Sequence, residues 1–125
     1  MQHSILKGRS ILLVEDELLI AMDVAHELED AGASVIMTGD LHEALVLAGN
    51  SGLSGAILDH GLRDGDSTLL RVRLSECGIP FLNYSASAAL EDGTDGSVHV
   101  SKPAVEGLLP AALADLIAAH DREKN

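Results

Sequence analysis

The chain has 125 residues, 46% of them hydrophobic but only 2% aromatic, which fits one domain with a core of aliphatic side chains. Twenty acidic residues against eight basic ones give a net charge of −12, which repels a phosphate backbone and excludes direct nucleic-acid binding. The sequence lacks a signal peptide pattern and any apolar run of about 18 residues, so we expect a cytoplasmic protein with no membrane contact.

Short apolar runs alternate along the chain with segments of helical period. Near-continuous apolar runs of this length are typical of strands that are covered on both faces. The five runs span residues 10–14, 34–38, 55–59, 80–85 and 97–101. Strands that alternate with helices in this way predict a parallel sheet with right-handed crossovers and helices on both faces.

Helical segments fill most of the spaces between the runs. Two of them repeat apolar residues every three to four positions. The repeating residues are Leu18, Met22, Ala25 and Leu28 in the first segment, and Val105, Leu108, Leu109, Ala112 and Leu116 in the last. Segments 40–49 and 66–77 each open on an acidic residue that can cap a helix. The single cysteine, Cys77, is expected to be a small packed residue near a helix end.

Polar residues with compatible chemistry follow four of the five predicted strands. Ligands of open parallel sheets bind beyond the carboxyl ends of the strands, where Glu15, Asp16 and Asp59 would bring negative charges together. Such charges need a cation, and Mg²⁺ prefers oxygen ligands. Ser85 and Lys102 end two further strands and can donate hydrogen bonds to a phosphoryl group. These residues are sufficient to form an aspartyl phosphate on Asp59.

The same residues lie in segments whose order and spacing resemble the response regulator receiver domain of two-component phosphorelays. The segments are Leu12-Leu-Val-Glu-Asp-Glu17, Ile57-Leu-Asp59, Pro80 through Ser85-Ala86, and Lys102-Pro103. The resemblance implies an α/β, flavodoxin-like fold with a five-stranded parallel sheet in the order 2-1-3-4-5. It also implies a single receiver domain over residues 1–125, with a core of about 9–121 and no output domain.

The resemblance assigns a role to each site residue. Asp59 is the phosphoacceptor, and Lys102 contacts the phosphoryl group. Mg²⁺ or Mn²⁺ is held by the Glu15, Asp16 and Asp59 carboxylates and by the Gly61 carbonyl. Ser85 is the switch hydroxyl. The domain is then not a classical enzyme, although it catalyses its own phosphorylation and dephosphorylation.

The resemblance also implies partners. The donor is a sensor histidine kinase or a histidine phosphotransfer protein, and an unknown downstream protein reads the signal. The domain acts as a switch, shuttle or sink, as a monomer or as a phosphorylation-dependent dimer.

Three of the departures from the family pattern bear on the switch and its surroundings. His99 occupies the position of an aromatic switch residue, and the short segment between Ser85 and Lys102 predicts a short or frayed fourth helix. Asn83 lies on the same face of its strand as Ser85, where a buried amide needs hydrogen-bond partners. The first two departures leave an alternative open, namely a phosphorylation-independent protein-interaction module on a receiver fold.

Overall fold

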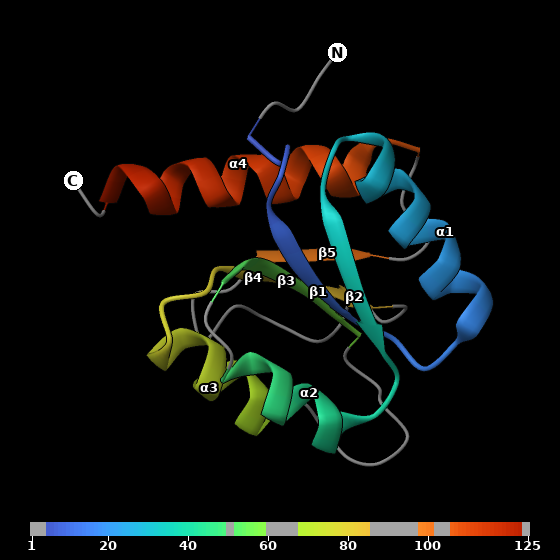
Figure 1. Cartoon of the computed structure of the whole chain (residues 1–125), viewed down its shortest axis with the longest axis vertical. Coiled ribbons are helices and arrows are strands. Elements are labelled where there is room, and N and C mark those ends of the chain that lie inside the picture. Colours follow the sequence, from blue (N-terminus) through green and yellow to red (C-terminus); the bar gives the residue numbers. More distant parts are fainter. Residues whose placement is uncertain (1–4, 50–51, 60–67, 86–97, 102–105, 124–125) are drawn as a thin grey trace.

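Five strands and four helices make up the regular structure in the part of the chain that the structure describes (Figure 1). The computed structural model describes residues 5–49, 52–59, 68–85, 98–101 and 106–123. The elements are β1 (Ser10–Val14), α1 (Leu18–Asp30), β2 (Ser34–Thr38), α2 (Leu41–Ala48), β3 (Leu53–Asp59), α3 (Thr68–Glu76), β4 (Phe81–Ser85), β5 (Val98–Ser101) and α4 (Leu108–Glu123).

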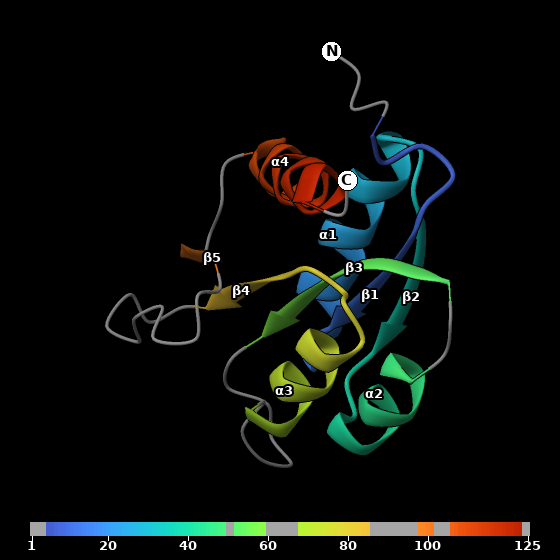
Figure 2. The same cartoon turned by 90° about the vertical axis from the view of Figure 1, so that its left-hand side faces the viewer.

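The strands form one parallel sheet in the order β2-β1-β3-β4-β5, which confirms the predicted fold class and strand order. Helices α1 and α4 cover one face of the sheet, and α2 and α3 cover the other (Figures 1 and 2). At the carboxyl end of β1, Val14 lies opposite Thr38 of β2 and Leu58 of β3. The three strands therefore end side by side.

Each face of the sheet has its own apolar core, and β1 contributes to both. Ile11 and Leu13 pack toward α1 and α4, whereas Leu12 and Val14 pack toward α2 and α3. All four side chains are at most 1% exposed. This burial on both faces explains why residues 11–14 are all apolar and do not alternate with polar residues.

The predicted faces of two helices agree with the observed ones only in part. In α1 the buried residues are Ala21, Val24, Ala25 and Leu28. Leu18 and Met22, which we expected to be buried, are 65% and 52% exposed. The apolar pattern of this segment is broad enough to offer two faces, and the small residues Ala21 and Ala25 allow the closer approach to the sheet.

In the last helix, α4, the predicted face is confirmed in part, because Leu109 is buried and Ala112 and Leu116 pack against the core. The predicted Val105 lies outside the described residues. The buried residues of α4 include Leu109, Leu113 and Ile117, and Leu108 is 41% exposed. The helix lies close to β3 at Gly55, where an added Cβ would be 3.1 Å from Ile117 Cδ1. Glycine at this position therefore lets α4 approach the sheet.

Cys77 directly follows α3 and is exposed, so the prediction of a packed cysteine is wrong. The chain turns there, with Gly78 at a φ of 72°, and leaves the thiol on the surface.

The predicted short fourth helix falls within residues 86–97, outside the described residues. No helix in the described part of the chain is long and apolar enough to cross a membrane.

Candidate functional site

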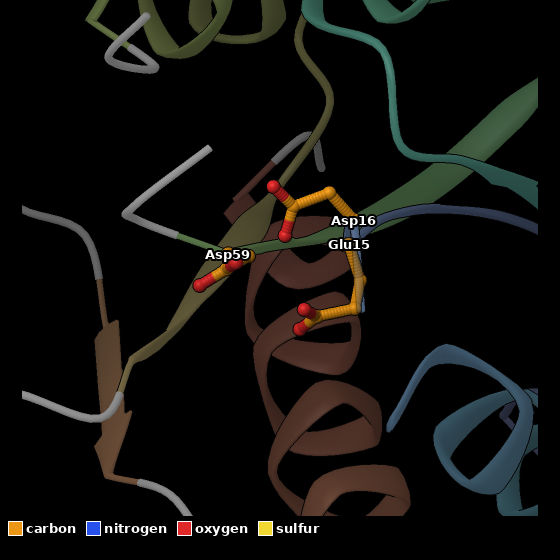
Figure 3. Close-up of side chains that lie close together, drawn as sticks. All are labelled: Glu15, Asp16 and Asp59. Atoms are coloured by element: carbon orange, nitrogen blue, oxygen red, sulfur yellow. The ribbon is translucent and has the colours of Figure 1, made fainter. Parts of the chain in front are cut away.

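Three carboxylates meet at the carboxyl end of the sheet. Glu15 and Asp16 directly follow β1, and Asp59 is the last residue of β3. Each offers an oxygen within 4.8 Å of the other two. Figure 3 shows the three side chains extending into the same space from neighbouring strand ends. Sequence reasoning predicted that these residues lie together, and the structure places them so.

The sheet register explains this convergence. Because Val14 pairs with Leu58, the next residues of the two strands, Glu15 and Asp59, reach the same level of the sheet. The Glu15 backbone N–H donates to the Thr38 carbonyl oxygen at 2.9 Å, which continues the ladder between β1 and β2 by one residue. The acidic residues are thus held by regular backbone pairing.

Burial differs among the three acids. Glu15 and Asp59 are only 5% and 8% exposed, and Asp16 is half-buried. The Glu17 backbone N–H donates to Glu15 Oε2 at 3.1 Å, which orients that carboxylate at the start of α1. The acids therefore leave the sheet with their backbone fixed and one side chain already oriented.

The donor set fits a hard divalent cation. Three carboxylate oxygens within 4.8 Å of one another repel when ionised, and a cation among them removes that repulsion. Oxygen-only ligands suit Mg²⁺, Mn²⁺ or Ca²⁺ and do not suit metals that prefer sulfur. The arrangement can therefore bind a cation and bring an anionic group to Asp59.

The turn from β2 to α2 packs against the acids, which sequence reasoning missed. Thr38 is 6% exposed, and its hydroxyl accepts from the Asp40 backbone N–H at 3.1 Å and donates to Glu43. A Cβ added to Gly39 would be 3.0 Å from Asp16 Cα. Asp40 followed by Glu43 is a helix-start pattern readable in the sequence, but the contact of the turn with Asp16 is not.

The other predicted site residues are placed only in part. The backbone of Ser85 ends β4, one residue beyond Tyr84, which pairs with Asp59. The backbone of His99 lies in β5 opposite Asn83, whose side chain is buried at 4% exposure, as predicted. The side chains of Ser85 and His99, and the whole of Gly61 and Lys102, lie outside the described residues. Their roles stay predictions.

Comparison with known proteins gives matches among solved structures. No protein-family model matches the sequence, and no curated protein matches it significantly. A response regulator receiver protein from Sinorhizobium medicae is 25% identical, with a TM-score of 0.82 over 92% of this chain and 98% of that chain. This similarity covers both molecules almost completely.

Two further similar structures contain a bound metal ion. A response regulator from Burkholderia pseudomallei with a phosphorylated aspartic acid, a calcium ion and citrate is 25% identical, with a TM-score of 0.75 over 94% of this chain and 75% of that chain. The receiver domain of a sensor histidine kinase from Pseudomonas aeruginosa, with magnesium in its active site cleft, is 22% identical, with a TM-score of 0.75 over 89% and 98%. At 22% identity, the similarity to the Pseudomonas aeruginosa domain shows a shared fold alone.

Proposed function

We propose that this chain, a response regulator receiver domain of the two-component type, accepts a phosphoryl group on the Asp59 carboxylate from a phosphohistidine donor. One observation carries the proposal. Asp59 ends the buried strand β3 with oxygens of Glu15 and Asp16 within 4.8 Å, in the fold of receiver domains. A nucleophilic carboxylate beside a cation site is what such a transfer requires.

The transfer forms one bond and breaks another. An Asp59 carboxylate oxygen attacks phosphorus in line with the leaving imidazole, the new O–P bond forms, and the N–P bond breaks with its electron pair returning to the ring nitrogen. The strand end holds Asp59 at 8% exposure, which limits the orientations of its carboxylate. Positioning and charge compensation then supply most of the catalysis.

Each remaining site residue has a proposed part in charge compensation. Glu15, Asp16, Asp59 and the Gly61 carbonyl would hold Mg²⁺ or Mn²⁺, which neutralises charge on the phosphoryl oxygens when bound. The Ser85 hydroxyl and the Lys102 ammonium donate to two other phosphoryl oxygens. When the Ser85 hydroxyl moves to contact the phosphoryl group, His99 takes part in transmitting that movement to the surface at β5.

The similar structures support the proposal by analogy. The Burkholderia pseudomallei protein carries a phosphorylated aspartic acid and a calcium ion, and the Pseudomonas aeruginosa domain carries magnesium in its cleft. Glu15, Asp16 and Asp59 of this chain bring three carboxylates together, and these could supply oxygen ligands to such an ion. Donors of the proposed class are a sensor histidine kinase or a histidine phosphotransfer protein, and the phosphorylated domain acts by contacting a further protein.

The experiment is phosphorylation with acetyl phosphate and Mg²⁺, read by intact-protein mass spectrometry. We expect the unaltered protein to gain one phosphoryl group and Asp59→Asn to gain none. Asp23→Asn removes an exposed carboxylate of α1 and should react like the unaltered protein. No mass gain in the unaltered protein at saturating Mg²⁺ would sink the proposal and favour a phosphorylation-independent interaction module.

A further inference from the structure

Gly39 lies against the backbone of the acid pair. A Cβ added to it would be 3.0 Å from Asp16 Cα, 3.2 Å from the Glu15 carbonyl oxygen and 3.4 Å from Asp16 Cβ. Two of these three atoms belong to the backbone, so they cannot move aside as the end of a flexible side chain does. Any side chain at position 39 therefore displaces either the turn or the acids.

Backbone conformation does not explain the glycine. The glycines with positive φ among the described residues are Gly8, Gly32, Gly52, Gly78 and Gly107, and Gly39 is not one of them. Its φ therefore lies outside the left-handed region that favours glycine. The lack of a side chain at Gly39 is thus required by the contact with Asp16 and not by the turn itself.

The turn is anchored more firmly than a surface loop. The Thr38 carbonyl accepts from the Glu15 N–H at 2.9 Å, and the Thr38 hydroxyl bonds both the Asp40 N–H and the Glu43 carboxylate. Asp40 Oδ1 in turn caps α2 by accepting from the backbone N–H of His42 at 2.8 Å. A side chain that clashes at position 39 would consequently displace Glu15 and Asp16 as well as the turn.

We propose that Gly39 is a positioning residue of the cation site. By carrying no side chain, it lets the β2–α2 turn, residues Thr38 to Asp40, lie directly on the backbone of Asp16 and fix where Glu15 and Asp16 leave the sheet. The inference rests on the proposed function in that the ligand is the divalent cation of the phosphoacceptor site. Residues that only orient metal ligands typically change metal affinity by about 10- to 100-fold.

The test is Mn²⁺ binding to the full chain, measured by the electron paramagnetic resonance signal of free Mn²⁺. We expect Gly39→Ala to raise the Kd for Mn²⁺ about tenfold. Gly49→Ala is the matched control, because its Cβ would make only ordinary contacts, 3.5 Å from the Val46 carbonyl oxygen and 3.7 Å from Arg73. It should leave the Kd unchanged.

A second control separates positioning from general loss of stability. Gly55→Ala places a Cβ 3.1 Å from Ile117 Cδ1 in the core under α4 and destabilises the fold away from the acids. It should lower the midpoint of urea unfolding and keep the Mn²⁺ affinity. An unchanged Kd in Gly39→Ala, or an equal loss of affinity in Gly55→Ala, overturns the inference.

A further variant tests the inference if Gly39→Ala folds too poorly to be measured. Thr38→Val keeps the shape of the side chain and removes the hydroxyl that anchors the turn, so it should also weaken Mn²⁺ binding. Unchanged binding in Thr38→Val then overturns the inference. If the unaltered protein binds Mn²⁺ but gains no phosphoryl group, the proposed function is wrong and this inference is unaffected. If the unaltered protein binds no Mn²⁺, this inference is wrong.

Discussion

Replacing Asp59 by asparagine should stabilise the fold when divalent cations are absent. The variant removes one of three carboxylates whose oxygens lie within 4.8 Å of one another. In the unfolded chain Asp59 is far from Glu15 and Asp16, so the repulsion acts almost entirely on the folded state. Asparagine keeps the size and most of the hydrogen-bonding capacity of the side chain, and the change therefore mainly removes charge.

The magnitude follows from the separation of the charges. Two unit charges 4.8 Å apart repel by about 3.5 kcal/mol at an effective dielectric constant of about 20, and by about 0.9 kcal/mol in bulk water. Glu15 and Asp59 are nearly buried, but Asp16 is half-buried and partly screened. We expect a net gain of about 1 to 3 kcal/mol in the free energy of unfolding.

Urea unfolding followed by circular dichroism in the presence of a chelator measures this gain, since the chain has no tryptophan for fluorescence. Saturating Mg²⁺ should reverse the order, because a cation at about 1,000 times its Kd stabilises the unaltered protein by about 4.1 kcal/mol. Asp23→Asn again serves as the control. If Asp59→Asn is less stable in chelator, or gains as much from Mg²⁺ as the unaltered protein, the three acids do not form a cation site.

Two further predictions concern the scaffold. Leu113→Ala should lower the free energy of unfolding by about 2 to 5 kcal/mol, because Leu113 is 0% exposed in the core under α4. Leu108→Ala, at a 41% exposed position of the same helix, should cost far less in the same urea titration. Asp40→Ala removes the cap of α2 and should cost about 1 kcal/mol, and Asp40→Asn should restore most of that loss in thermal unfolding. An Asp40→Ala protein as stable as the unaltered one would show that the cap contributes nothing.

Much of the fold is readable from the sequence because its strands are short, apolar and regularly spaced. The run Ser10 to Val14 is apolar because both of its faces are buried, and that same burial makes the strand recognisable. The convergence of Glu15 with Asp59 follows from parallel pairing, since the carboxyl ends of adjacent strands lie together. The strand prediction therefore rests on side-chain burial on both faces of the sheet, and the prediction of the site rests on the geometry of parallel pairing.

What could not be read depends on packing between distant segments. The pattern of α1 allowed either Leu18 and Met22 or Ala21 and Val24 to face the core, and only the contact with the sheet and α4 selects the second pair. Likewise, Gly39 looks like an ordinary turn residue until Asp16 is placed beside it. Such contacts join residues far apart in the sequence and leave no local signal.

Strand β1 links the two helical layers in a way that bears on folding. Because alternate side chains of β1 enter the core under α1 and α4 and the core under α2 and α3, neither layer can complete its packing until β1 is in place. A shift of β1 by a single residue would exchange the two sets of side chains and misfit both cores together. The two halves of the molecule are thus expected to unfold as one cooperative unit, with no stable intermediate in which only one layer remains.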